Sequence, residues 1–137
     1  METNKTQKVI DGIVIPTQVT EFVDCNILEV ECGTTGFKGG DSGHGGRTYF
    51  RIGDQASTDM RLRYMDSGDW QWHDIEVRQI EIVFGGDSEL ETFARALKFG
   101  YDQLKRHAML TFKERMRIRW WHLKWDVKAM FRKLKKG

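Results

Sequence analysis

Gly33-Thr-Thr-Gly-Phe-Lys-Gly-Gly-Asp-Ser-Gly-His-Gly-Gly46 forms a glycine-rich stretch that runs directly into the strand-like Arg47-Thr-Tyr-Phe-Arg-Ile52. Seven of the first fourteen residues are glycine, which is half of the 14 glycines in the chain. Glycine reaches positive φ without a steric penalty, but it loses more entropy on folding than any other residue. So many glycines together are tolerated only where the loop is disordered or where its backbone shape is used.

The residues between the glycines favour a loop whose backbone shape serves to bind a ligand. A glycine-rich loop that leads into a strand can point several N–H groups at one anion. Arg47 or Arg51 would help to hold phosphates, and an aromatic ring, Phe37 or Phe84, would stack on a base. The predicted ligand-binding residues are Thr34, Thr35, Phe37, Gly39, Gly40, Asp41, Ser42, His44, Arg47, Arg51 and Phe84. A floppy hairpin loop without a ligand is the alternative interpretation.

Catalytic and metal-binding patterns are missing from the sequence. Gly40-Asp-Ser-Gly43 is similar to a serine protease nucleophile loop, but no histidine precedes Ser42 as that arrangement requires. Lys38 is followed by glycines and a strand, which excludes a Walker-type phosphate loop. The later histidines and the two cysteines show no zinc-ligand spacing. We therefore predict no enzyme activity, no catalytic residue, no metal and no cofactor.

Length and composition predict one domain over residues 1–137, with a β-core at 1–86 and a helical part at 87–137. The polar N-terminus argues against a signal peptide, and no apolar run reaches the length of a membrane span. Two cysteines, Cys25 and Cys32, are expected to be free thiols in a reducing cytoplasm. Charge is asymmetric, since residues 1–102 carry 10 Lys/Arg against 18 Asp/Glu and residues 103–137 carry 12 against 2.

Alternation of apolar and polar residues predicts the strands. A short strand or hairpin over Val9–Ile15 should stop at Pro16, and a bulge near Arg78–Gln79 should restore the phase of the last strand. The other expected elements are strands at Phe22–Cys32, Arg47–Ile52 and Met60–Tyr64, a turn at Gly53–Ser57, a loop at Asp66–Asp74 and an end of the sheet at Gly85–Gly86.

The period changes from two to about 3.6 after Gly86. Ser88 to Glu91 reads as a capping box, with Asp87 adding negative charge at the helix start. One apolar stripe continues to Arg106, and a second runs from Met109 to Leu134 with Ile118, Trp121 and Trp125 off its line. The predicted fold is therefore α+β: an antiparallel sheet of about five strands followed by two C-terminal helices.

Several segments resemble a phage protein family, the first-described type of Thoeris anti-defence protein. The matching segments are Phe22–Val30, Gly33–Ile52, Ala56–Asp59 and Gly85–Leu90, within residues 20–105. The resemblance implies a β-sheet core with C-terminal helices. It also implies a sponge that sequesters, uncleaved, cyclic ADP-ribose-type signals made by bacterial TIR enzymes, in dimers or higher assemblies. Some members also hold cyclic oligonucleotides.

The resemblance further implies that the protein acts in the cytoplasm of the bacterial host. Separately, the apolar stripe of the second helix is longer than a sheet of about five short strands can cover, which predicts a homo-oligomer formed through the C-terminal helices, with no membrane or DNA partner. The family's contact residues are not carried over individually. The alternative function uses only the basic, Trp-rich C-terminal helix, as a nucleic-acid-binding protein or as a membrane-surface protein. The sponge needs the glycine loop, whereas either alternative needs only this helix.

Overall fold

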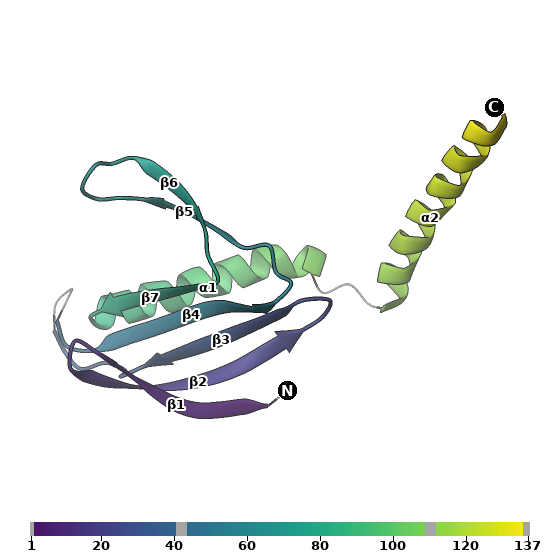
Figure 1. Cartoon of the computed structure of the whole chain (residues 1–137). Helices are drawn as coiled ribbons and strands as arrows, with labels where there is room; N and C mark the ends of the chain where they lie inside the picture. Colours follow the sequence, from purple (N-terminus) through teal and green to yellow (C-terminus); the bar gives the residue numbers. More distant parts are fainter. Residues whose placement is uncertain (1, 41–43, 109–111, 136–137) are drawn as a thin grey trace. The chain divides into compact units, whose positions relative to one another are not determined.

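The computed structural model describes residues 2–40, 44–108 and 112–135. The strands are β1 (Thr3–Ile10), β2 (Ile13–Val23), β3 (Ile27–Thr34), β4 (Arg47–Ala56), β5 (Arg61–Met65), β6 (Trp72–Glu76) and β7 (Gln79–Gly85), and the helices are α1 (Asp87–Ala108) and α2 (Phe112–Lys135). Five strands form one antiparallel sheet in the order β1-β2-β3-β4-β7, while β5 and β6 pair only with each other (Figure 1). The predicted α+β fold is confirmed.

The N-terminal hairpin is longer than predicted. Asp11 and Gly12 make its turn with positive φ, and β2 passes through Pro16 instead of ending there. Pro16 pairs with Gln7 of β1, while the β2–β3 ladder begins only at the Thr17–Gly33 pair. The proline therefore lies beyond the doubly paired part of β2, where a missing N–H is tolerated.

The predicted strand Phe22–Cys32 is two strands. Val23 ends β2 and Ile27 begins β3, because a tight turn over Asp24–Asn26 reverses the chain. The alternation that motivated the prediction is present in β3 itself. Both cysteines are free thiols, as predicted, with Cys25 in the turn and Cys32 in β3.

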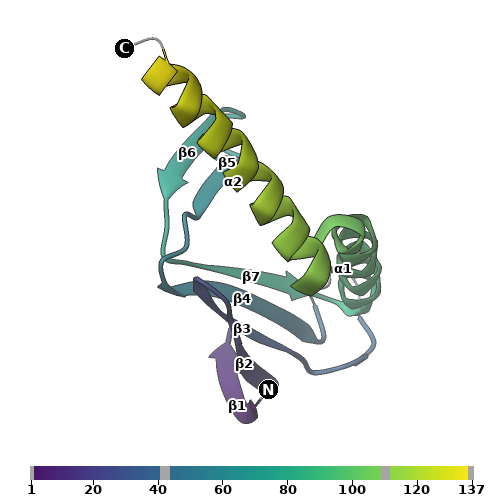
Figure 2. The same ribbon diagram turned by 90° about the vertical axis from the view of Figure 1, so that its right-hand side faces the viewer.

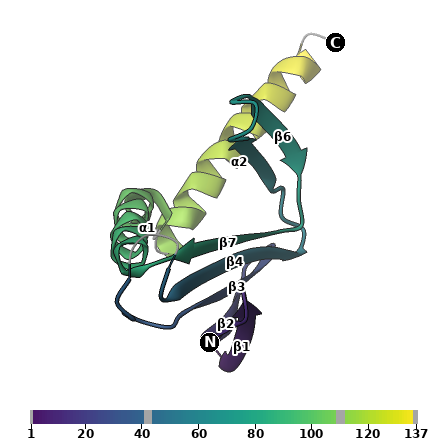
Figure 3. The ribbon, with the colours of Figure 1, turned by 90° about the vertical axis from the view of Figure 1, so that its left-hand side faces the viewer.

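The segment from β4 to β7, which includes the β5–β6 hairpin, differs from the sequence predictions. The expected loop ends early, since β6 starts at Trp72, and β4 continues through the expected turn to Ala56. The predicted bulge near Arg78 is wrong: Ile75 lies in β6 of the small sheet, and Ile80 lies in β7 of the large one. The alternation of apolar residues changes phase between Val77 and Ile80 because the chain passes there from the small sheet to the large one. Figure 3 shows this hairpin extending away from the five strands.

Strand register divides the large sheet into two faces. The helix face carries Phe50 and Phe84, and Phe93 of α1 packs on both, with ring centroids 5.8 and 4.5 Å apart. The opposite face, here called the charged face, carries Glu29, Glu31, Tyr49, Arg51 and Glu81, and it also holds Ile15. The two fully buried side chains of the described residues, Ile15 and Tyr49, both lie on the charged face.

The sheet is curled, and Figure 2 shows β1 and β2 turning away from the plane of β4 and β7. Three strand spacings separate β1 from β4, about 14 Å in a flat sheet. The Lys8 ammonium of β1 nevertheless lies 6.0 Å from the centroid of the Tyr49 ring in β4. The curl therefore buries the middle of the charged face, where Ile15, Glu31, Tyr49 and Arg51 lie, whereas Glu81 of β7 stays exposed.

The chain divides into two compact units, Met1–Ala94 and Arg95–Gly137. The division lies inside α1, a turn or two after Asp87. In the second unit, α1 continues to Ala108 and α2 follows as a separate helix. Met109, the first residue of the second predicted stripe, lies outside the described residues. Within the parts of the chain that the structure describes, neither helix is long and apolar enough to cross a bilayer.

Candidate functional site

Two threonines close the stem of the glycine loop. The Thr35 N–H donates to the Arg47 carbonyl at 3.0 Å, and the Arg47 N–H donates to Thr35 Oγ1 at 2.9 Å. Thr34 Oγ1 accepts the Gly36 N–H at 3.1 Å and lies 3.0 Å from Thr48 Oγ1. Both hydroxyls thus shape the loop itself, although they were predicted to bond a ligand.

The two arms of the loop lie against each other. Gly39 and Gly45 have φ of 69° and 72°, a conformation that other residues rarely adopt. A Cβ placed on Gly45 would lie 2.7 Å from the Gly39 carbonyl oxygen. Gly45 therefore serves both the turn and the close approach of the two arms.

The loop already holds one anion, the carboxylate of Asp87. The Lys38 N–H donates to Asp87 Oδ1 and the Gly39 N–H donates to Asp87 Oδ2, each at 2.9 Å. Two consecutive N–H groups that converge on both oxygens of one carboxylate form a backbone nest. Asp87 is the first residue of α1, so the contact also ties the helix start to the loop. We call these two N–H groups the nest.

Arg47 is engaged within the chain. Its Nε lies 3.2 Å from Asp11 Oδ2 in the β1–β2 turn, and its Nη1 donates to the carbonyls of Gly45 and Gly46 at 3.4 and 3.1 Å. The Gly46 carbonyl also accepts the Gly86 N–H at 2.9 Å. The guanidinium therefore braces the returning arm of the loop.

Four other residues of the loop are open to solvent. Phe37 is 66% exposed, which leaves its ring available for stacking. Lys38 and His44 are exposed as well, and so is Gly40. Two of the predicted ligand residues, Asp41 and Ser42, lie outside the described residues.

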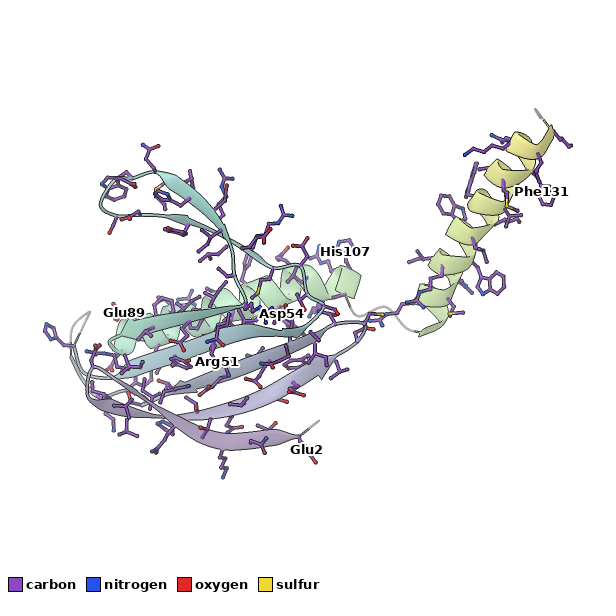
Figure 4. The ribbon with its side chains drawn as sticks, in the orientation of Figure 1. Glu2, Arg51, Asp54, Glu89, His107 and Phe131 are labelled. Atoms are coloured by element: carbon purple, nitrogen blue, oxygen red, sulfur yellow. The ribbon has the colours of Figure 1, made fainter. Side chains whose placement is uncertain are left out.

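Arg51 lies on the charged face, in the middle of the sheet (Figure 4). It is 7% exposed, and its Nη2 lies 2.6 Å from Glu29 Oε1 and 3.2 Å from Glu31 Oε1. Burial alone would lower the pKa of Arg51, but hydrogen bonds and attraction from Glu29 and Glu31 outweigh it and raise that pKa. Arg51 therefore balances buried carboxylates, and the structure does not place it with the loop.

The neighbours of Arg51 complete a polar cluster. Glu31 also accepts a hydrogen bond from Thr17 Oγ1 at 2.8 Å and lies 3.6 Å from the Lys8 ammonium. The Tyr49 hydroxyl donates to Glu81 at 2.8 Å. Burial, with this hydrogen bond next in importance, raises the pKa of Tyr49. These contacts show a structural role for the cluster.

Phe84 lies on the other face, beneath α1. Its ring centroid is 4.5 Å from that of Phe93, so it serves the packing of the helix. The structure thus gathers Thr34, Thr35 and the glycines with Arg47, and it places Arg51 and Phe84 on opposite faces of the sheet. Asp87 was missed as a loop contact, because its place 48 residues after Gly39 gives no signal in the sequence.

Beside the loop, the helix face of β1, β2 and β3 is open and hollowed. This β1–β3 groove has a volume of about 730 Å³. Its lining is Thr3, Lys5, Thr6, Pro16, Thr17, Gln18, Val19, Thr20, Phe22, Val30, Cys32, Gly33 and Thr34. Partial burial raises the pKa of the Cys32 thiol. Sequence reasoning did not predict the groove, since most of β1 and β2 was not recognised as strand.

One trio of side chains in the described residues has the make-up of a cation site. Asp66, Asp69 and His73, at the turn of the β5–β6 hairpin, each place a ligand atom within 4.8 Å of the others. His73 Nε2 lies 3.0 Å from Asp69 Oδ2, which accounts for their proximity without a metal. Both aspartates are exposed.

Searches of protein-family models, curated proteins and solved structures found no match to this chain.

Proposed function

We propose that this chain is a phage anti-defence sponge, which binds cyclic ADP-ribose-type signals in the host cytoplasm and withholds them without cleaving them. The observation that supports the proposal is the nest, in which the N–H groups of Lys38 and Gly39 hold both oxygens of one carboxylate at 2.9 Å. A site of this kind suits the phosphate of a nucleotide. The sequence resemblance of the same loop to the Thoeris anti-defence family supplies the ligand class.

In this proposal a ligand phosphate takes the place of the Asp87 carboxylate. The exposed ring of Phe37 then lies beside the bound nucleotide, and the Lys38 ammonium adds charge beside the phosphate. Thr34, Thr35 and Arg47 contribute to binding indirectly, because their contacts fix the shape of the loop. Affinity then depends on how readily Asp87 leaves the nest.

The direct test is a calorimetric titration with each cyclic ADP-ribose isomer, followed by heat denaturation of the complex. We expect one isomer to bind and to be recovered with its mass unchanged, because the nest stabilises a bound anion without supplying a reactive group. A hydrolysed product would contradict the sponge, and so would the absence of binding at any excess of protein.

A variant pair locates the phosphate within that test. Asp87→Ala should bind the ligand about tenfold more tightly, since it removes an internal competitor whose charge-assisted bonds are worth about 1.5–3 kcal/mol. Glu91→Ala, one helical turn further on, removes the same charge from an exposed position and should leave affinity unchanged. Equal effects of the two changes would place the phosphate away from the nest.

Self-association through the C-terminal helices is part of the proposal. Many side chains of α2 are exposed, among them Trp120, Trp121 and Trp125 at 63, 58 and 51%. At about 100° per residue, Trp120 and Leu123 fall on one side of the helix and Trp121 and Trp125 on the other. Two apolar sides separated by basic residues suit a helix that lies between neighbours better than one that lies flat on a bilayer.

The distribution of charge along the chain also supports self-association. Residues 103–137 carry 12 Lys/Arg against 2 Asp/Glu, a net +10, whereas residues 1–102 carry 10 against 18, a net −8. Opposite charges of this size favour contact between copies of the chain.

We expect size-exclusion chromatography with light scattering to show a dimer or larger species at micromolar concentration. The pair Trp120→Ser and Trp125→Ser should shift the chain toward the monomer, because it removes an apolar side chain from each side of α2. Trp70→Ser, at the tip of the β5–β6 hairpin, is the matched control. A wild-type monomer that binds DNA or anionic vesicles would favour the alternative function.

A further inference from the structure

The β1–β3 groove is built from ordered rows of side chains across three strands. Strand register places Lys5, Gln18 and Cys32 in one row. The neighbouring row holds Thr3, Thr20 and Val30. Because paired residues point to the same side of a sheet, both rows face the groove.

The lining offers the contacts that a nucleoside needs. Lys5 brings a cation, and Gln18, Thr3 and Thr20 bring hydrogen-bond donors and acceptors for a sugar or a base edge. Apolar contact comes from Pro16, Phe22 and Val30. Phe22 is 49% exposed, so its ring is accessible for stacking. The groove volume of about 730 Å³ lies within the range of small-molecule sites.

The groove joins the glycine loop directly. Thr34, the last residue of β3, lines the groove, and its hydroxyl accepts the Gly36 N–H inside the loop. Thr34 pairs with Thr48, which pairs with Phe84 two residues before Gly86 and the helix start. Two strand spacings, about 10 Å, therefore separate Thr34 from β7, near which Asp87 fills the nest. A nucleotide with two phosphates spans such a distance.

We propose that the β1–β3 groove binds the base and ribose of the same anionic nucleotide whose phosphate enters the nest. This inference rests on the proposed function and adds a second, distinct surface to it. Cys32 lies on the floor of this surface, between Gln18 and Phe50 in the ladder. Bound ligand therefore covers its thiol.

The alkylation rates of the two cysteines report whether the ligand covers the groove, and this test needs no mutation. Cys32 lines the groove, whereas Cys25 lies exposed in the β2–β3 turn outside it. The full chain is alkylated with iodoacetamide, with and without the cyclic ADP-ribose isomer that gives the largest heat of binding. At a ligand concentration about ten times Kd, Cys32 labelling should slow about tenfold, in proportion to the free protein. Cys25 labelling should not change.

Charge reversal gives an independent readout. Lys5 is exposed, so Lys5→Glu should fold normally and weaken nucleotide binding about tenfold through lost attraction and new repulsion. Arg61→Glu in the β5–β6 hairpin makes the same change of charge outside the groove. Its affinity should match that of the unmodified chain.

The outcomes separate the two proposals. Slower Cys32 labelling together with weaker binding by Lys5→Glu supports the groove. A ligand that binds while Cys32 and Cys25 label as before, and while Lys5→Glu keeps its affinity, overturns the groove and leaves the sponge standing. The absence of any binding heat overturns both.

Discussion

Arg51→Ala should lower the free energy of unfolding by about 3–5 kcal/mol. The guanidinium lies within 3.2 Å of both Glu29 and Glu31, and Glu31 is only 2% exposed. Removing the cation leaves the buried Glu31 carboxylate with only the Thr17 hydroxyl and the more distant Lys8 ammonium as partners. Urea unfolding followed by circular dichroism measures the change.

Two further variants test this cause. Arg61→Ala breaks an exposed pair with Asp59, and such pairs contribute about 1 kcal/mol or less. Arg51→Met combined with Glu31→Gln removes both charges while keeping the volume, and it should recover much of the loss. If the double variant were as unstable as Arg51→Ala, an uncompensated buried charge would not be the cause of the loss.

Gly33→Ala should be the most damaging single methyl addition in the sheet. An added Cβ would lie 2.0 Å from the Pro16 carbonyl oxygen and 2.7 Å from the Thr17 Cα, both backbone atoms of β2. Neither atom can yield without breaking the Thr17–Gly33 pair that begins the β2–β3 ladder. We expect a loss of about 3 kcal/mol or more, at the upper end for overpacking.

The reason lies in the curl of the sheet. Gly33 stands between Thr17 of β2 and Tyr49 of β4 on the charged face, and its missing side chain lets the backbone of β2 approach. Gly100→Ala in α1 is the matched control, since its added Cβ meets nothing within 4 Å. It should stabilise the helix by about 0.5–1 kcal/mol. Thermal unfolding of both variants gives the comparison, and equal melting temperatures would contradict the role of Gly33.

Local patterns predicted the parts of the fold that depend on local rules. Alternation located β3 and β5, and the end of the sheet at Gly85 followed from its two glycines. The helix α1 begins at Asp87, one residue before the predicted capping box. Strand partners were beyond reach, because the split between β6 and β7 depends on which sheet each strand joins.

The candidate site was predictable to the same degree. The density of glycines located the loop, because so many glycines have a high entropy cost on folding and are expected only where the backbone takes a special shape. The functions of individual residues depended on distant partners. Arg47 meets Asp11 and Arg51 meets Glu29, 36 and 22 residues away in sequence. A cation in a sequence predicts an anion nearby, but it does not tell whether that anion is a ligand or a carboxylate of the same chain.

The β5–β6 hairpin has a consequence for how such a protein can diverge. β4 and β7 are paired partners, with Gly53 opposite Gln79, so residues 57–78 form an insertion between adjacent strands. Its described backbone hydrogen bonds to the rest of the chain include the one from Asp54 N–H to the Arg78 carbonyl. The β5–β6 hairpin can therefore change in length and sequence while the register of the five strands stays the same. Its exposed Trp70 and Trp72 are free to adapt to new surroundings without cost to the sheet.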